Sequence, residues 1–365
     1  MADRILPSHA GSLPRPEDVV ELNYRRGHGG LDDEAAFEAK LAEAVKGVVA
    51  RQREIGIDVV NDGEYGHAMN FRYDFGPWWM YVFERLGGLE ITDKGLPEVE
   101  QAPAKPGEIT LAPFGQRRDF LEFSEAYSDP TSHAALPNPE IGTGAPICTG
   151  PLTYKGQALI ERDIANMKAA LEAAGLEDGF LNAVAPASCA RFATEYYKTD
   201  EELIYACADA MREEYKAIVD AGLILQLDDP AIAENWDQIN PAPSVEDYKR
   251  FTMMRVEALN HAIRDLPQER IRFHLCWGSW HGPHVTDIPM ADIVDVMLAI
   301  DAGAYSFEAG NVRHEHEWKV WQDAKLPEGK VILPGVVSHA TNVVEHPELV
   351  ADRLVRFAGV VGRRT

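Results

Sequence analysis

The chain has few cysteines and no long apolar run. Its 365 residues include four cysteines, which lie far apart at positions 148, 189, 207 and 276, with no paired spacing. This scatter argues against a disulfide framework and favours a reducing, cytoplasmic environment. No stretch approaches the roughly 18 apolar residues that a membrane helix needs, and the opening residues MADR begin no signal core. We therefore expect a cytoplasmic protein that does not span a membrane.

Positive charge is also scarce. Lysine and arginine total 35 against 59 aspartates and glutamates, which gives a formal net charge of -24. Nucleic acids and anionic membrane surfaces bind clustered lysine and arginine, so both are excluded as partners. The 45% hydrophobic content is enough for a large core. We expect small molecules as partners, and association into a homo-oligomer is left open.

Apolar runs typical of strands alternate with helical stretches along the chain. The predicted strands fall at about residues 4–13, 57–63, 145–151, 180–188, 223–229, 271–277, 303–309 and 331–338. Amphipathic helices are predicted at 33–56, from a capping box at Thr199 onward, and at 289–300. This alternation predicts parallel pairing, and the closed form is a (β/α)8 TIM barrel, here one domain over residues 1–365.

An open, doubly wound α/β sheet is the alternative fold. No Gly-x-Gly-x-x-Gly loop follows the first predicted strand, which counts against the dinucleotide-binding version of that fold. Residues 76–140 hold eight prolines and several aromatic clusters, and they break the strand–helix rhythm. We predict that they form a long insertion after the second strand, serving as a lid or an interface arm.

His274 and Cys276 are the most informative pair. They stand two residues apart in the predicted strand RFHLC, so their side chains point to the same face. Imidazole and thiolate are ligands that zinc prefers, and Glu308, in the next predicted strand, offers a carboxylate. The alternative is that His274 and Cys276 are ordinary core residues, because free cysteine is among the most buried residue types.

Other polar residues also follow predicted strands at their carboxyl ends, where barrel enzymes have their active sites. Glu64 and Asp228 are carboxylates in apolar surroundings, which are costly to bury unless paired or bound to a cation. A zinc site beside them would suit a small thiol substrate, because zinc removes the proton of a thiol whose free pKa is about 8.5. Glu64 and Asp228 would then hold a cationic group on that substrate, or else form part of an ion pair that closes the barrel mouth.

Taken in order, these motifs resemble the catalytic barrel of the cobalamin-independent methionine synthase family. The matching pieces are Gly11-Ser12-Leu13-Pro14, Asp62-Gly63-Glu64, Leu227-Asp228-Asp229-Pro230, His274-x-Cys276, Glu308 and Pro334-Gly335-Val336. The resemblance implies a zinc ion (Zn2+) bound by His274, Cys276 and Glu308. It also implies that Ser12, Glu64 and Asp228 bind homocysteine, and that His339 protonates the methyl donor, a 5-methyltetrahydropteroyltriglutamate.

The chain departs from the family in three places that bear on this activity, one of them the lack of the family's aspartate near His339 in the run Val336-Val337-Ser338-His339. The family has a fourth zinc ligand, a cysteine after the eighth helix, whereas no cysteine follows Cys276 before Thr365. That ligand therefore lies beyond a truncated C-terminus, or the site has three protein ligands, or zinc binding is lost. The segment 185–188 also lacks the family's Thr-Gly-Pro form and the tryptophan after it, which leaves the folate donor open.

Two alternatives to methionine synthesis follow from these departures. Epoxyalkane:coenzyme M transferases share the zinc–thiol chemistry, but coenzyme M has a sulfonate and no amino group. Such an enzyme would need an arginine at the thiol site, for which Arg15, Arg72 and Arg313 are candidates. The other alternative is a non-catalytic or metal-free barrel with an incomplete zinc site.

Overall fold

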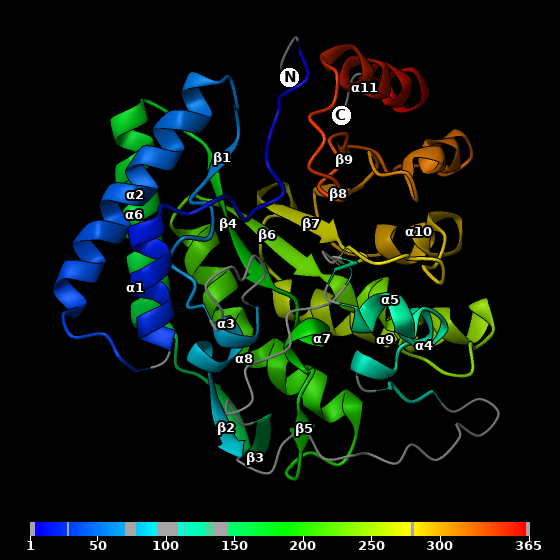
Figure 1. The fold of residues 1–365 in the computed structure, drawn as a ribbon, viewed down its shortest axis with the longest axis horizontal. Helices are drawn as coiled ribbons and strands as arrows, with labels where there is room; N and C mark the ends of the chain where they lie inside the picture. Colours follow the sequence, from blue (N-terminus) through cyan, green and yellow to red (C-terminus); the bar gives the residue numbers. More distant parts are fainter. Residues whose placement is uncertain are drawn as a thin grey trace.

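A parallel six-stranded sheet runs through the centre of the molecule (Figure 1). The computed structural model describes residues 4–27, 29–69, 78–92, 109–112, 114–129, 131–132, 134, 145–278 and 281–362. The strands of this sheet, in spatial order, are β1 (Val60–Asn61), β4 (Gly179–Val184), β6 (Ile224–Asp229), β7 (Ile271–Leu275), β8 (Ala304–Glu308) and β9 (Val331–Gly335). The order follows the chain without a reversal. A doubly wound sheet reverses at its switch point, so this sheet has the order of a barrel.

The sheet curls into a half-barrel, and the first predicted strand joins it at one point. Within residues 4–13, Ser8 makes a single parallel bridge to Val59, and the Pro7 carbonyl accepts hydrogen bonds from the N–H groups of Asp58 and Val59. The prediction of a full strand at 4–13 is therefore wrong. Beyond the bridge, the backbone carbonyls of this segment accept hydrogen bonds from side chains of the sheet and, among the described residues, not from the backbone of a neighbouring strand.

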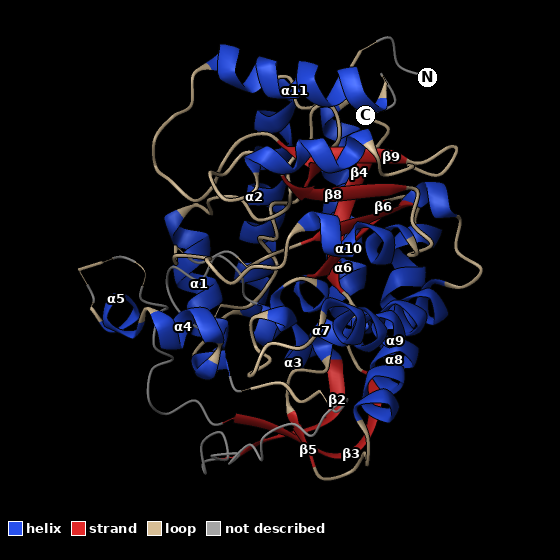
Figure 2. Ribbon diagram, turned by 90° about the vertical axis from the view of Figure 1, so that its right-hand side faces the viewer, coloured by secondary structure: helices blue, strands red, loops and turns tan. Residues whose placement is uncertain are grey.

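The prediction that residues 145–151 form a barrel strand is also wrong. They belong to β3 (Ala145–Tyr154), which pairs antiparallel with β2 (Leu86–Thr92) and parallel with β5 (Ala193–Thr194). These three strands form a second sheet at the far end of the molecule from the parallel sheet (Figure 2). In the parallel sheet β1 pairs directly with β4, so no position is left for β3 between them.

Helices cover the outer face of the parallel sheet and the region below it (Figures 1 and 2). The longer helices are α1 (Glu17–Gly27), α2 (Glu34–Glu54), α6 (Gln157–Ala174), α8 (Asp200–Asp220), α9 (Val245–Ile263), α10 (Met290–Leu298) and α11 (Pro347–Val361). Short helices are α3 (Trp78–Arg85), α4 (Arg118–Glu122), α5 (Ser124–Ser128), α7 (Pro186–Cys189) and the 3-10 segments η1 (Phe114–Gln116), η2 (Pro230–Ile232), η3 (Glu234–Trp236), η4 (Gln268–Arg270) and η5 (Glu315–Gln322). Part of the predicted insertion lies outside the described residues, so its extent stays a prediction.

The predicted helices are confirmed, with the capping that the sequence indicated. Thr199 accepts a hydrogen bond from the Glu202 N–H at 3.2 Å, and the Glu202 carboxylate accepts one from the Lys198 N–H at 2.9 Å. This reciprocal pair starts α8. Asp33 caps α2 in the same way, by accepting from the Ala36 N–H at 2.9 Å. In the part of the chain that the structure describes, no helix is both long and apolar enough to cross a membrane.

Alternation along the strands separates an apolar face from a polar one. In β6, Leu225 and Leu227 belong to the hydrophobic core, while Gln226 and Asp228 between them are polar and equally buried. Neighbouring strands repeat the pattern in register, because Gln226 pairs with Arg272 of β7. The apolar face packs under the helices. The concave face therefore carries polar side chains inside the curled sheet.

Candidate active site

The polar side chains of the concave face are stacked in rows set by strand register. Asp228 of β6, His274 of β7 and Ser306 of β8 are register partners in adjacent strands. The His274 Nδ1 lies 3.1 Å from the Ser306 hydroxyl, so these side chains share one face. Two residues after His274 and Ser306 come Cys276, just past the end of β7, and Glu308, the last residue of β8. Barrel interiors are built from such layers, and the layer at the carboxyl end forms the mouth.

Two buried carboxylates, Glu64 and Asp228, are joined by one amide. The Asn182 Nδ2 donates to Glu64 Oε1 at 2.5 Å and approaches Asp228 Oδ2 at 3.4 Å. Gln226 Nε2 donates to the other oxygen, Asp228 Oδ1, at 2.8 Å. Burial raises the pKa of Glu64 to about 7, and burial together with the nearby Glu64 raises the pKa of Asp228 well above its usual range. A bound cationic group would offset this cost by favouring the ionised carboxylates.

The segment that contains Ser12 is held against the same face. Side chains from three strands donate to consecutive backbone carbonyls: Asn61 to Gly11, Gln226 to Ala10 and Arg272 to His9. The Arg272 guanidinium is buried, which lowers its pKa to about 10, and lies 3.9 Å from the Phe180 ring centroid. The Ser12 hydroxyl follows in this segment and is buried without a hydrogen-bond partner among the described residues. These contacts hold the segment that contains Ser12 against the face on which Asn182 joins Glu64 and Asp228.

Gly11 has no room for a side chain. A Cβ at this position would overlap the Asn182 amide nitrogen and lie 2.5 Å from Glu64 Oε1. We expect Gly11→Ala to lower the free energy of unfolding by about 1–3 kcal/mol, because the amide and the carboxylate must both shift. Urea denaturation measures the change. Gly47→Ala is the matched control, since a Cβ there meets open space and should be neutral or stabilising; equal losses in both variants would contradict this account.

The predicted zinc ligands come from two adjacent strands, but they do not converge in the structure. Among the described residues, no three His, Cys, Asp or Glu side chains are grouped so that they could hold a metal ion. The His274 ring faces Ser306, and the Cys276 sulfur accepts a hydrogen bond from the Gly278 N–H at 3.3 Å. Burial lowers the pKa of His274 to about 4 and raises that of the Cys276 thiol. A neutral imidazole, a thiol and a carboxylate on one face are the donor types that zinc takes, so the set fits by chemistry.

Glu308 pairs with His339 instead. The His339 Nε2 lies 3.0 Å from Glu308 Oε1, and the His339 side chain is 54% exposed at the mouth. The hydrogen bond to Glu308 raises the pKa of His339. Burial would raise the pKa of Glu308, but His339 outweighs it and the net shift is downward. The pair places a protonatable imidazole beside the concave face.

A second histidine network fastens the loop that follows β7. The His314 Nδ1 lies 2.8 Å from Glu317 Oε2, and its Nε2 lies 3.1 Å from Asp287 Oδ2. Asp287 also approaches the His284 Nδ1 at 3.0 Å. Asp119 of α4 accepts from the His284 N–H at 3.2 Å. The loop that begins after Cys276 is thereby tied to both η5 and α4.

His314 should give the protein a pH-dependent stability. Burial lowers its pKa, but the hydrogen bonds to Asp287 and Glu317 outweigh it and raise the pKa to about 9, above the unfolded value of about 6.5. The stabilisation is therefore complete below about pH 6.5 and lost as pH rises through 9. The free energy of unfolding of the wild-type protein should fall by on the order of 2–3 kcal/mol between these pH values. In His314→Gln we expect this fall to be absent. Chemical denaturation at each pH compares the two proteins, and an unchanged slope in the variant would contradict this assignment.

Sequence reasoning missed the amides and the arginine that organise the site. Asn182 is the one polar residue of β4, and Gln226 and Arg272 precede Asp228 and His274 by two residues in β6 and β7. Their positions were a readable signal, because a polar group on the buried face of a strand needs a partner. Of the arginines considered for a sulfonate, Arg15 donates to the Glu64 carbonyl at 2.8 Å and Arg313 to the Val285 carbonyl at 2.6 Å. Arg72 lies outside the described residues.

A curled parallel sheet with polar groups at the carboxyl ends of its strands defines a TIM-barrel-like α/β protein. Solved structures share this fold. A B12-independent methionine synthase from a Shewanella species, in complex with selenomethionine, has a TM-score of 0.66 and 19% identity, covering 98% of this chain and 87% of that chain. A putative vitamin-B12-independent methionine synthase from Listeria monocytogenes has a TM-score of 0.60 and 18% identity, covering 99% and 89%.

Curated protein sequences that are similar to this chain include homocysteine methyltransferases. A 5-methyltetrahydropteroyltriglutamate–homocysteine methyltransferase of Thermotoga petrophila is 24% identical over 314 residues, which are 84% of this chain and 33% of the relative. An uncharacterized protein of Bacillus subtilis is 26% identical over 290 residues, covering 74% and 61%. No protein-family model matches. The chain spans about a third of the length of the Thermotoga relative. These relatives confirm the resemblance: the chain is similar to the cobalamin-independent methionine synthases.

Proposed function

We propose that this chain transfers a methyl group from a folate-type donor to the sulfur of homocysteine, with zinc as its metal. The observation that carries the proposal is the buried pair Glu64 and Asp228, bridged by Asn182 on the concave face. Two carboxylates at this depth, with raised pKa values, form a subsite for an ammonium group. An amino thiol supplies that group, whereas coenzyme M does not.

Different groups of residues on the concave face would bind the substrate and the metal. Glu64 and Asp228 would bind the ammonium group, and Ser12, which the carbonyl contacts of the first segment hold nearby, would bind the carboxylate. His274, Cys276 and Glu308 would hold zinc. When bound, zinc makes the substrate thiol available as a thiolate at neutral pH. The register of β6, β7 and β8 supports this arrangement, because it orders the ammonium subsite and the donor set along one face.

His339 would supply the proton that the methyl donor requires. Loss of the methyl group leaves an electron pair on the donor's nitrogen, which must be protonated. The raised pKa of His339 favours the protonated imidazole, and the place of this side chain at the mouth is open to an incoming donor.

The experiment that tests this function is methyl transfer by the purified chain with added zinc. We expect formation of methionine from homocysteine and a methyltetrahydropteroyl donor. His339→Gln should lower kcat by about 10²–10⁴-fold, the usual contribution of a general acid, while zinc content and homocysteine affinity stay unchanged. If homocysteine affinity and kcat fall by equal factors, His339 has a structural role and is not the general acid. Alkylation of coenzyme M by an epoxide would contradict the proposed function and favour the epoxyalkane:coenzyme M transferase. Absence of both bound metal and turnover would favour the non-catalytic barrel.

A further inference from the structure

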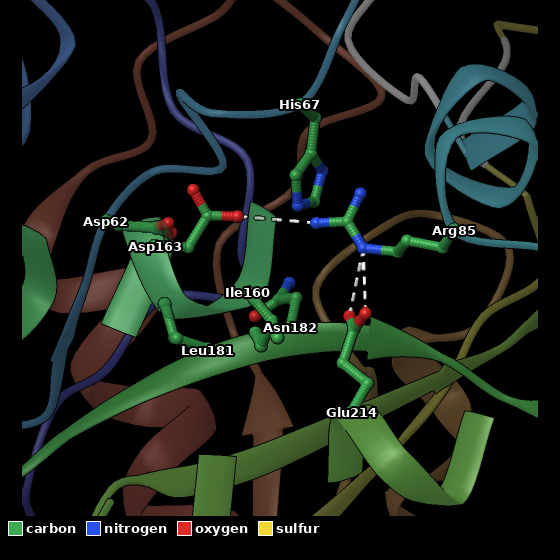
Figure 3. A pocket seen from close by; sticks show the side chains of 8 residues that line it. All are labelled: Asp62, His67, Arg85, Ile160, Asp163, Leu181, Asn182 and Glu214. Atoms are coloured by element: carbon green, nitrogen blue, oxygen red, sulfur yellow. Dashed lines mark hydrogen bonds and ion pairs between the residues drawn. The ribbon is translucent and has the colours of Figure 1, made fainter. Parts of the chain in front are cut away.

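A buried cluster of charged side chains includes Asp62 and His67, which lie on either side of Glu64 in the sequence (Figure 3). The pocket at its centre is lined by Asp62, His67, Arg85, Ile160, Asp163, Leu181, Asn182 and Glu214. Asn182 belongs to both sites, since its amide also donates to Glu64 and approaches Asp228. The cluster is therefore adjacent to the acid pair, although the proposed reaction does not use it.

Arg85, the last residue of α3, is the centre of this cluster. Its Nε donates to both carboxylate oxygens of Glu214 in α8, at 2.9 and 3.1 Å, and its Nη2 donates to Asp163 of α6 at 3.3 Å (Figure 3). The guanidinium lies 3.7 Å from the Tyr81 ring centroid. All three ionic side chains are almost fully buried. Removing one partner would leave buried charge uncompensated, so this geometry fixes α3 in one position.

His67 connects α3 with Glu64. Its ring packs against Tyr81 of α3, with 4.8 Å between ring centroids, and its Nδ1 lies 3.9 Å from Glu64 Oε2. Both His67 and Glu64 are buried. The imidazole thus fills the space between the helix and the carboxylate, and a shift of α3 would be passed to Glu64 through it.

A parallel contact connects the cluster with the backbone of the same loop. The Asp163 carboxylate that binds Arg85 also pairs with Arg162 at 2.8 Å, and Arg162 donates to the Gly66 carbonyl at 2.9 Å. This support matters because Glu64 has φ of 61°, a left-handed conformation that costs a residue with a side chain about 1–2 kcal/mol. The loop keeps that conformation because its surroundings hold it.

We propose that Arg85 and His67 are positioning residues for the ammonium subsite, through which α3 sets the place of the Glu64 carboxylate relative to Asp228. This inference rests on the proposed function of the acid pair and deepens it. The residues touch no substrate. They act on the part of the ligand that Glu64 holds, so their loss should weaken recognition of the amino group and leave the rest of the ligand unaffected.

The test compares two thiols that differ only in the amino group, homocysteine and 4-mercaptobutyrate. Calorimetric titration of the zinc-loaded full chain gives the Kd of each. In His67→Gln and Arg85→Met we expect the Kd of homocysteine to rise about tenfold, as for the loss of one well-placed charged contact, while the Kd of 4-mercaptobutyrate stays unchanged. Arg85→Lys should keep part of the preference for homocysteine, because the lysine side chain retains the positive charge but lacks the bidentate geometry of the guanidinium.

Arg117→Met is the matched control, since Arg117 is another fully buried arginine, paired with Glu234 at 3.3 Å away from the Glu64 loop. It should reduce stability without changing the ratio of the two affinities. Folded variants of His67 and Arg85 with an unchanged ratio would overturn the inference, and so would equal weakening of both thiols. If Arg85→Met does not fold, His67→Gln decides alone. Wild-type protein that shows no preference for homocysteine would instead refute the proposed function itself.

Discussion

Asp228→Asn is expected to weaken homocysteine binding by about 10²–10³-fold. A bound ammonium group would then face one buried carboxylate instead of two, and truncating one partner of a buried, hydrogen-bonded charge pair costs about 2–5 kcal/mol. The asparagine side chain has the same size as the aspartate, so packing is preserved. The hydrogen bonds from Asn182 and Gln226 to this side chain are the main protein contacts that change. Calorimetric titration with homocysteine measures the effect.

The neighbouring residue provides the control for this prediction. Asp229 is as buried as Asp228, but it accepts from the Ser188 hydroxyl at 2.7 Å and caps η2 through the Ala231 N–H. Asp229→Asn should lower stability and leave homocysteine affinity within about twofold. If the two variants bind homocysteine equally well, the acid pair is a structural feature of the barrel and no ammonium subsite.

Cys276→Ala is expected to remove the metal. The proposed site has three protein ligands, one of them a thiolate, and losing it should reduce bound zinc from about one per chain to near zero. Elemental analysis after dialysis against a weak chelator gives the stoichiometry. Cys189→Ala is the control, because this buried thiol belongs to the hydrophobic core and should have no effect on zinc. Zinc retained without Cys276, or a wild-type protein that never binds zinc, would contradict the proposed ligand set.

The order of the parallel strands and the meeting of Glu64 with Asp228 could be predicted because both depend on local pattern, whereas the convergence of His274, Cys276 and Glu308 does not appear among the described residues. Parallel strands bring their carboxyl ends to one edge, so Glu64 and Asp228 were expected to meet there. The amide that joins them belongs to Asn182, on a strand that carries none of the predicted motifs. A single polar residue inside FLNAV was the available signal.

The departures from prediction have a different origin. The apolar run at 145–151 indicates a strand but says nothing of which sheet it joins, and pairing with β2 decides that through contacts distant in sequence. The segment at 4–13 has the composition of a strand, yet its carbonyls are bonded by side chains of β1, β6 and β7. Such long-range partners leave no periodic trace in the sequence.

Glu64 has a further property that the sequence does not display. Its left-handed backbone is supported by the Asp62 carboxylate, which accepts from the Glu64 N–H at 2.9 Å, and by the cluster around Arg85. Strain held by surrounding structure is common where a side chain must be aimed at a ligand. The contact between α3 and this loop would give the helix the proposed role in ligand recognition, which its own motif, WWMYVFER, does not suggest.

The most direct test is a competitive titration of the zinc-loaded chain with homocysteine and coenzyme M. Buried acids that bind an ammonium group should prefer homocysteine by at least about 100-fold, because the sulfonate of coenzyme M brings negative charge to the concave face and no amino group. Equal or tighter binding of coenzyme M would contradict the account.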